Sequence, residues 1–81
     1  MYIEIWSKTN CPYCDMAERI AQQFVQESDN NYVKWMLDED FTREELFDKF
    51  PGARTFPQIR VDGENIGGYT EFKELIENIV D

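Results

Sequence analysis

The chain has 81 residues, of which 42% are apolar and 15% aromatic. This length allows one compact core, and this composition favours a folded domain over disorder, so we expect a single domain over residues 1–81. Seventeen acidic residues against eight basic ones give a formal net charge of -9. Because phosphate binding requires a basic face, nucleic acid is not an expected partner.

The first residues, MYIEIW, do not show a basic stretch followed by a long apolar run. No apolar segment of the chain is long enough to span a bilayer. We therefore expect no signal peptide, no membrane partner and a cytoplasmic protein. In that reducing compartment, a close pair of cysteines is more often catalytic or metal-binding than a structural crosslink.

The first half of the chain predicts a strand followed by a helix. Residues 2–6, YIEIW, alternate with Ile3 and Ile5 on one face, which is typical of a strand. Residues 11–27 predict an amphipathic helix, which the SDNN at 28–31 ends. The apolar residues at helical spacing are Met16, Ala17, Ile20, Ala21, Phe24 and Val25.

A second strand and a short helix come next. Residues 32–37, YVKWML, mix β-branched and aromatic residues and predict a strand. Thr42 and Glu45 have the spacing of a capping box, and the PG at 51–52 ends the helix that they begin. The apolar stripe of this helix is expected from Leu46, Phe47 and Phe50.

The last third of the chain predicts a hairpin and a closing helix. Residues 56–61, FPQIRV, predict a strand, and Asp62-Gly63 predicts a tight turn into a fourth strand around Ile66. The closing helix is expected to be capped by Thr70. Its apolar residues are Phe72, Leu75, Ile76 and Ile79.

The predicted order is therefore βαβαββα. A β-α-β unit of this size implies a right-handed crossover between parallel strands, and the late hairpin adds an antiparallel pair. We expect an α/β fold with a four-stranded mixed sheet and helices on both faces.

Both cysteines of the chain lie in SKTNCPYCDMAERI, at the predicted junction of strand and helix. A helix start directs unpaired N–H groups and the positive end of the dipole at the Cys11 sulfur, which favours the thiolate. Pro12 suits the first helical position. Lys8 adds a positive charge, whereas Asp15 opposes ionisation. Cys14 lies on the same side of the helix, where it can close a disulfide with Cys11 as the less exposed, resolving thiol.

The cysteine pair has two other interpretations, a structural zinc site and a merely buried pair. A structural zinc site usually needs four Cys or His ligands, and the chain has two cysteines and no histidine. The cysteines could also be two buried core residues without a reactive role. The position of Cys11 at a predicted helix start, close to Lys8, makes this interpretation less favoured. The absence of histidine also argues against Cys-His hydrolysis, which leaves thiol-disulfide exchange as the preferred chemistry.

Three motifs in order, CPYC, ARTFPQI and IGGYTEF, make the chain resemble a dithiol glutaredoxin over essentially its whole length. The Trp-Cys-Gly-Pro-Cys site of a thioredoxin is not present. The resemblance implies a thioredoxin-like fold and glutathione as the reductant.

The resemblance also implies roles for particular residues. Cys11 would be the nucleophile and Cys14 the resolving thiol. Tyr13 would flank glutathione, and Lys8 would pair with its glycine carboxylate. In the second helix the family often supplies Gln or Arg to that carboxylate, and the matching place lies beside Arg43.

The implied site continues around a proline loop and a glycine pair. Thr55, Phe56 and Pro57 correspond to a Thr-Val-Pro segment with a cis proline, whose backbone pairs with the cysteinyl part of glutathione. Gly67 and Gly68 let the backbone approach the ligand, and the following helix start meets its γ-glutamyl end. The full implied glutathione site is Lys8, Tyr13, Arg43, Thr55, Phe56, Pro57, Gly68, Tyr69, Thr70 and Glu71.

Two residues of this site depart from the family pattern. Phe56 stands where valine is usual, which keeps the backbone contacts but alters the wall of the pocket. Glu71 stands where aspartate is usual, which lengthens the arm toward the γ-glutamyl amine.

We therefore expect a glutathione-dependent thiol-disulfide oxidoreductase that reduces protein disulfides and protein-glutathione mixed disulfides. It should be a monomer, with no metal and no tightly bound cofactor. Its partners would be glutathione and disulfide-bearing or glutathionylated proteins, and ribonucleotide reductase is a client typical of the family.

The alternative is a binding module, because some glutaredoxins hold an iron-sulfur cluster between two subunits through the first cysteine and glutathione. Pro12 argues against this alternative, since the cluster binders usually carry a smaller residue there. Colourless protein after anaerobic purification would eliminate it.

Overall fold

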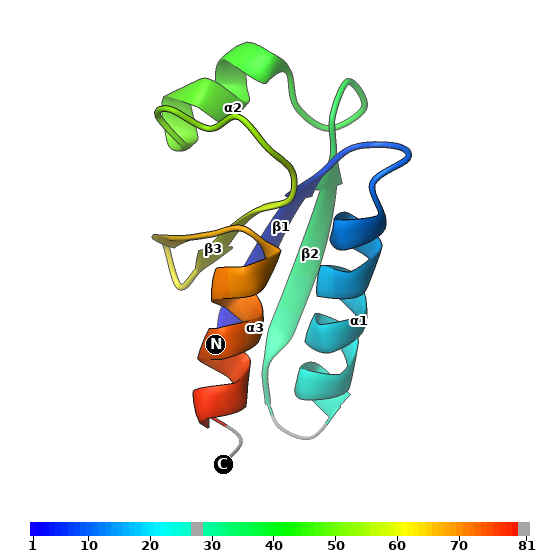
Figure 1. The fold of residues 1–81 in the computed structure, drawn as a ribbon, viewed down its shortest axis with the longest axis vertical. Coiled ribbons are helices and arrows are strands. Elements are labelled where there is room, and N and C mark those ends of the chain that lie inside the picture. Colours follow the sequence, from blue (N-terminus) through cyan, green and yellow to red (C-terminus); the bar gives the residue numbers. More distant parts are fainter. Residues whose placement is uncertain (27–28, 80–81) are drawn as a thin grey trace.

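The computed structural model describes residues 1–26 and 29–79, and within these residues the predicted element order βαβαββα is confirmed (Figure 1). The predicted helix end at residue 27 and Ser28 of the SDNN segment lie outside the described residues. The elements are β1 (Tyr2–Ser7), α1 (Pro12–Gln26), β2 (Asn31–Met36), α2 (Arg43–Lys49), β3 (Gln58–Val61), β4 (Glu64–Gly67) and α3 (Tyr69–Ile79).

The four strands form one mixed sheet in the order β2-β1-β3-β4. β1 pairs with β2 in parallel, and β3 runs antiparallel to both of its neighbours. The turn between β3 and β4 places Asp62 at φ 50° and Gly63 at φ 84°. Two consecutive residues at positive φ are typical of the two-residue hairpin turn that Asp-Gly predicts. The α/β architecture expected from the sequence, a four-stranded mixed sheet with helices on both faces, is confirmed.

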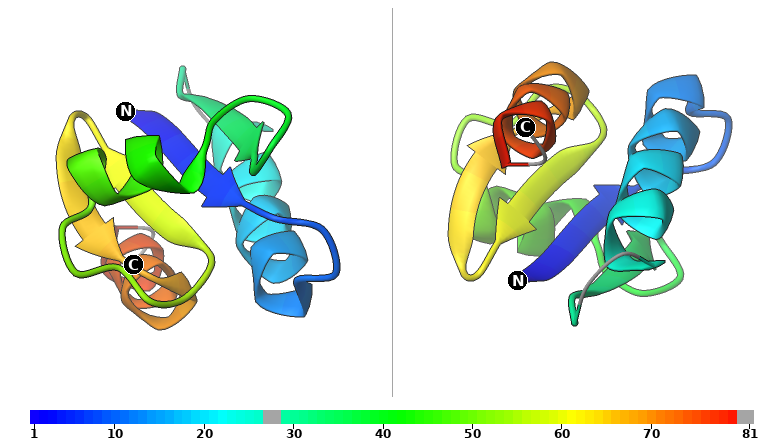
Figure 2. Two further views of the ribbon diagram at one scale, coloured as in Figure 1. Left: turned by 90° about the horizontal axis from the view of Figure 1, so that it is seen from above. Right: turned by 90° about the horizontal axis from the view of Figure 1, so that it is seen from below.

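The alternation of β1 divides the core into two parts. Ile3 and Ile5 are fully buried among residues of α1 and α3, which are neighbours on one face of the sheet. Trp6 points to the other face, where it packs with Phe41 and with Leu46 of α2. Seen from above, α2 lies in front of β1 (Figure 2, left). β1 is therefore packed on both faces, and the loop that carries the cysteines starts at its carboxyl end.

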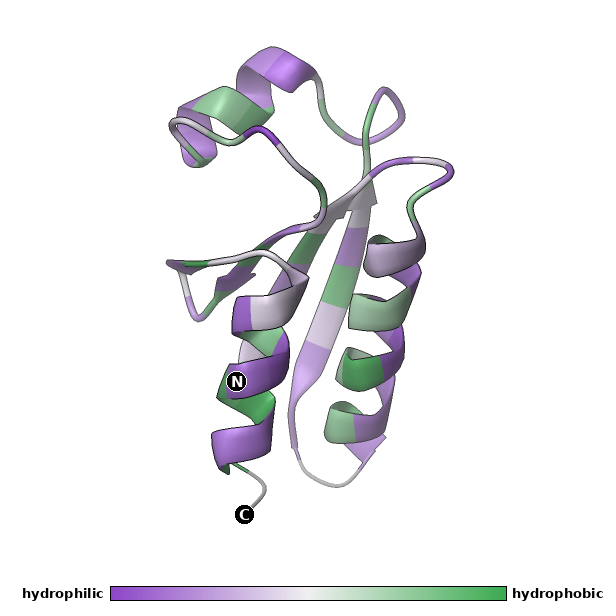
Figure 3. Cartoon of the chain, in the orientation of Figure 1, coloured by the Kyte–Doolittle hydropathy of each residue, from purple (hydrophilic) through white to green (hydrophobic). Residues whose placement is uncertain are grey.

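Three apolar residues that the helical spacing assigns to the core are exposed: Met16, Phe47 and, at the end of α3, Ile79 with 45% of its surface exposed. Figure 3 shows hydrophilic residues along the outer side of α1. In this helix Met16 has 38% of its surface exposed, whereas its neighbour Ala17 is fully buried. In α2 the buried residue is Leu46, whereas Phe47 is 46% exposed. Neighbouring helical residues lie about 100° apart, so a narrow contact buries only one of an adjacent apolar pair.

None of the helices in the described part of the chain has the length and apolar content that crossing a membrane requires.

Candidate active site

The two cysteines lie where β1 gives way to α1. Cys11 directly precedes α1, which begins at Pro12, and Cys14 lies in the first helical turn. The two sulfurs form a disulfide, with the Cα atoms 5.2 Å apart. Cys14 is fully buried, whereas Cys11 retains 8% of its exposure. An attacking group can therefore reach only the Cys11 side of the pair, as expected for a nucleophile with a deeper resolving thiol.

Backbone N–H groups at the start of α1 are directed toward Cys11. The Asp15 N–H donates to the Cys11 carbonyl oxygen over 3.2 Å, and the Cys14 N–H donates to the same oxygen over 3.1 Å. The Cys14 N–H also lies 3.2 Å from Cys11 Sγ, to which it donates. When the disulfide is reduced, this donor and the helix dipole favour the Cys11 thiolate.

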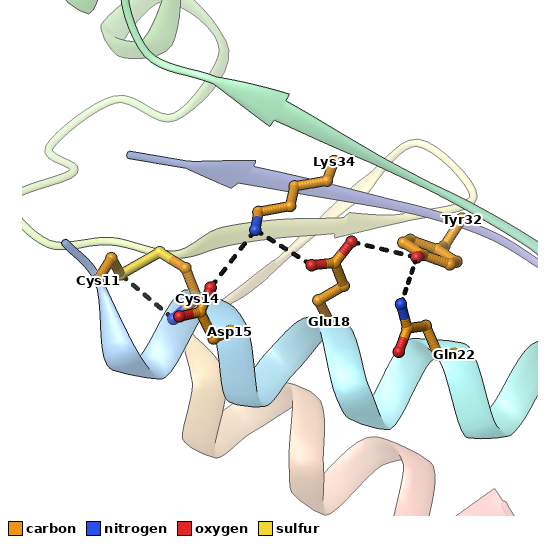
Figure 4. A network of polar contacts seen from close by, with 7 residues as sticks. All are labelled: Cys11, Cys14, Asp15, Glu18, Gln22, Tyr32 and Lys34. Carbon is orange, nitrogen blue, oxygen red and sulfur yellow. Dashed lines mark hydrogen bonds and ion pairs between the residues drawn. A yellow bond between two sulfur atoms is a disulfide. The ribbon is translucent and has the colours of Figure 1, made fainter. Parts of the chain in front are cut away.

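A network of side-chain contacts joins this helix to β2 (Figure 4). Lys34 Nζ donates to Glu18 Oε1 over 3.1 Å and pairs with Asp15 Oδ1 at 3.5 Å. The Tyr32 hydroxyl donates to the other Glu18 oxygen, and Gln22 donates to that hydroxyl, each over 3.1 Å. Burial acts to lower the pKa of Lys34, but hydrogen bonds and charge from Glu18 and Asp15 outweigh it and raise the pKa above 10.5. Lys34 therefore stays charged through neutral pH.

The proline loop before β3 carries the cis peptide bond expected from the resemblance, between Phe56 and Pro57. Pro57 is fully buried. The Gln58 side chain donates to the Thr55 carbonyl oxygen over 2.7 Å, which closes the loop on itself. A Cβ atom placed on Gly68 would lie 3.5 Å from the Pro57 carbonyl oxygen, so the backbone before α3 runs directly beside this loop.

The start of α3 differs from the predicted one, because Thr70 does not cap the helix. The helix begins at Tyr69, and the Phe72 N–H donates to the Gly68 carbonyl oxygen over 3.1 Å. Glu71 Oε1 accepts a 2.7 Å hydrogen bond from the Gly68 N–H. A glutamate that reaches back to the residue before the helix forms one half of a capping box. Glycine therefore occupies the cap position, and Glu71 supplies the side-chain acceptor.

Gly67 is required at this turn by both its conformation and its neighbour. Its φ of 127° is one that residues with a side chain rarely adopt. A Cβ atom at this position would lie 2.8 Å from Glu71 Oε1, closer than real contacts allow. The absence of a side chain at residue 67 is thus what lets Glu71 cap α3.

A cleft of about 280 Å³ gathers most of the predicted glutathione site. Tyr13 connects this cleft to the disulfide, because it is the residue before Cys14, and its ring lies 5.5 Å from the ring of Tyr69. A larger cleft of about 440 Å³ lies against the loop 50–55 and β4, away from the cysteines. The residues that line the smaller cleft are Tyr13, Thr55, Phe56, Pro57, Gly68, Tyr69, Thr70 and Glu71.

Two members of the predicted site do not line this cleft. The exposed Lys8 has its Nζ 6.0 Å from the centre of the Phe56 ring, so it lies beside the cleft wall. Arg43 is the first residue of α2, whose buried Leu46 packs on the opposite face from α3. Roles of Lys8 and Arg43 in binding stay predictions.

The Lys34 network is the part of this region that sequence reasoning missed. A lysine in the predicted strand, facing a helix with acidic residues three apart at Asp15 and Glu18, was the signal that could have found it. Among the described residues, no group of three or more His, Cys, Asp or Glu side chains could hold a metal ion.

The family model and the related proteins that match this chain all belong to one family. The family model described as Glutaredoxin matches residues 3–66. Glutaredoxin 1 of Escherichia coli is 33% identical over 84 residues, which cover 100% of this chain and 99% of the relative. A glutaredoxin of Haemophilus influenzae is 35% identical, covering 95% of this chain and 92% of the relative.

Solved structures of the Escherichia coli protein agree with this relationship. The structure of reduced Escherichia coli glutaredoxin superimposes with a TM-score of 0.81 at 35% identity, over 100% of this chain and 99% of that one. The oxidised form gives a TM-score of 0.79 at the same identity, over 95% and 94% of the two chains.

Proposed function

The chain belongs to the glutaredoxin family, and we propose that it uses glutathione to reduce protein disulfides and protein-glutathione mixed disulfides. Family membership and the vicinal dithiol make it a thiol-disulfide oxidoreductase, with Cys11 and Cys14 as the redox pair. The proposal adds the reductant and the kinds of disulfide that it reduces.

The observation that carries the proposal is the cleft beside the cysteine pair. Its proline loop offers the backbone of Phe56, and the start of α3, which lies beside the same loop, offers a helix N-terminus. A helix N-terminus favours a carboxylate such as that of the γ-glutamyl group. The Glu71 carboxylate has two oxygens, so it can accept from a ligand ammonium while Oε1 accepts from Gly68.

The proposed reaction on a glutathionylated protein uses Cys11 alone. The Cys11 thiolate attacks the glutathione sulfur, the protein leaves as its thiolate, and a Cys11-glutathione disulfide forms. A second glutathione thiolate attacks this disulfide at the glutathione sulfur. Oxidised glutathione leaves, and the Cys11 thiolate is regenerated. The disulfide of the oxidised glutathione joins the glutathione removed from the protein to the second glutathione.

The proposed reaction on a protein disulfide uses both cysteines. The Cys11 thiolate attacks one sulfur of the disulfide and forms a mixed disulfide with the protein. The Cys14 thiol, after losing its proton, attacks Cys11 Sγ, and the protein leaves as a dithiol. The Cys11-Cys14 disulfide that remains takes two electrons from two glutathione molecules.

The proposed partners are glutathione and proteins that carry disulfides or bound glutathione. Ribonucleotide reductase is included as a client because it is typical of the family. We also propose that the protein works as a monomer in the cytoplasm.

A glutathione-coupled assay tests the proposal. The purified protein is given a glutathionylated peptide, glutathione, glutathione reductase and NADPH, and consumption of NADPH is followed. We expect turnover that depends on enzyme concentration and that is lost in Cys11→Ser. Wild-type turnover in Cys11→Ser would show that the proposed mechanism is wrong.

A further inference from the structure

The carboxylates closest in sequence to the redox pair are held by a lysine from a different element. Asp15 directly follows Cys14, and its own N–H donates to the Cys11 carbonyl oxygen. Its carboxylate lies 3.5 Å from Lys34 Nζ, and Glu18 lies 3.1 Å from the same nitrogen. Lys34 thus contacts two anions on the first turns of the helix that begins at the redox pair (Figure 4).

The exposed fractions of these three side chains show that Glu18 is the more buried partner of Lys34. The side chains of Lys34 and Glu18 are 22% and 26% exposed, whereas that of Asp15 is 66% exposed. Tyr32 donates to Glu18 from the same strand as Lys34, so both oxygens of the Glu18 carboxylate accept from residues of β2. Asp15 is therefore the more solvent-exposed partner of Lys34, which it contacts at 3.5 Å.

We propose that Lys34 is a positioning residue for the redox pair: it orients the Asp15 carboxylate toward β2 and offsets its charge, which favours the Cys11 thiolate in the reduced protein. The charged groups involved are Lys8 in the loop before Cys11, Asp15 and Glu18 on α1, and Lys34 on β2. A carboxylate free to approach Cys11 would oppose ionisation of the thiol. Lys34 removes that opposition while leaving Asp15 at the helix start, where an anion stabilises α1.

The inference extends to the reduction potential. Reduction of the Cys11-Cys14 disulfide adds two electrons, and a group that stabilises the resulting Cys11 thiolate stabilises the reduced form. Lys34 therefore makes the pair a stronger oxidant. This inference rests on thiol-disulfide exchange at the pair and is independent of whether glutathione is the reductant.

The test measures the Cys11 pKa from the pH dependence of alkylation of the reduced protein, and the reduction potential in a dithiothreitol redox buffer. In Lys34→Met we expect the ratio of thiolate to thiol to fall about threefold, the scale of a partly exposed ion pair. The same factor in the disulfide equilibrium makes the potential more negative by about 14 mV. Lys34→Arg should restore both values, and Lys73→Met, an exposed lysine of α3, serves as the matched charge control.

A double variant separates positioning from a direct effect of the lysine charge. In an Asp15→Asn background, Lys34→Met should shift the Cys11 pKa less than it does in the wild type. An equal shift in both backgrounds, or a Lys34→Met shift no larger than that of Lys73→Met, would overturn the proposal.

A further measurement needs no lysine variant, and it keeps the test open if Lys34→Met does not fold. Salt screens exposed pairs, so raising the ionic strength should raise the Cys11 pKa more in wild type than in Asp15→Asn. Equal salt dependence in the two proteins would also overturn the proposal. Because neither readout contains glutathione, failure here is distinguishable from failure of the proposed glutathione activity.

Discussion

The Cys14 backbone N–H donates to Cys11 Sγ over 3.2 Å, so the residue that supplies the resolving thiol also supplies a hydrogen bond to the nucleophile. The two roles reside in different atoms of Cys14. A change of its side chain can remove the thiol and keep the backbone donor.

Cys14→Ser should therefore separate the two proposed reactions. The Cys11 thiolate keeps its backbone donor and its position at the start of the helix. Turnover of a glutathionylated peptide should therefore stay within about threefold of wild type, a change smaller than the loss of one hydrogen bond would cause. Reduction of a protein disulfide should be lost, because no thiol remains to resolve the mixed disulfide. Both rates are measured with glutathione and glutathione reductase. Retention of protein-disulfide reduction would contradict the role of Cys14 as the resolving thiol.

Gly67→Ala should destabilise the protein and weaken glutathione binding. The new Cβ atom would sit at a φ of 127° and collide with Glu71 Oε1, so we expect a loss of about 1–3 kcal/mol in the free energy of unfolding and a higher KM for glutathione. Urea unfolding and steady-state kinetics measure the two effects. Gly63→Ala is the matched control, because Gly63 has a positive φ but nothing within 4 Å of its Cβ position.

The control should lose stability from backbone strain alone and keep the wild-type KM. If Gly67→Ala and Gly63→Ala gave the same KM, the close approach of residue 67 to Glu71 would have no part in binding.

Glu71 should show a stability role and a binding role that two substitutions separate. Glu71→Ala removes the acceptor for the Gly68 N–H, and we expect it to cost about 0.3–1.5 kcal/mol of unfolding free energy. Glu71→Gln keeps an acceptor oxygen but removes the charge expected to meet the γ-glutamyl amine. It should lose less stability and still raise the KM for glutathione. An unchanged KM in Glu71→Gln would mean that the carboxylate does not meet the ammonium group.

Thr42→Ala should lower stability without changing the chemistry. The Thr42 hydroxyl accepts from the Glu45 N–H and the Glu45 carboxylate accepts from the Thr42 N–H, so α2 starts with a complete capping box. Losing the threonine side chain costs about 0.5–2 kcal/mol in comparable caps. Thr42→Ser is the matched control and should keep most of the stability. A fall in kcat of folded Thr42→Ala would show that the start of α2 takes part in the reaction.

The parts of the fold that short segments determine were predictable from the sequence. The Thr42-Glu45 capping box and the Asp62-Gly63 turn each depend on residues within three positions of each other, and both occur as predicted. Placing Cys11 at the start of a helix needed only the strand pattern before it and Pro12 after it.

The sequence predictions that were wrong concern features that depend on how helices and strands pack against one another. The exposure of Met16, Phe47 and Ile79 depends on which side of each helix meets the rest of the fold, and periodicity alone does not contain that information. Thr70 is a typical capping residue and so predicts the cap, but Gly67 leaves room for the Glu71 side chain to reach back to the Gly68 N–H instead. The Lys34 network joins residues of two elements and has no local motif.

We propose above all that Cys11 uses glutathione as its reductant. The most direct test of this proposal compares turnover of one glutathionylated peptide with two reductants, glutathione with glutathione reductase and thioredoxin reductase alone, each supplied with NADPH. We expect turnover that saturates with glutathione concentration, negligible turnover with thioredoxin reductase, and none in Cys11→Ser. Efficient turnover with thioredoxin reductase and none with glutathione would contradict it.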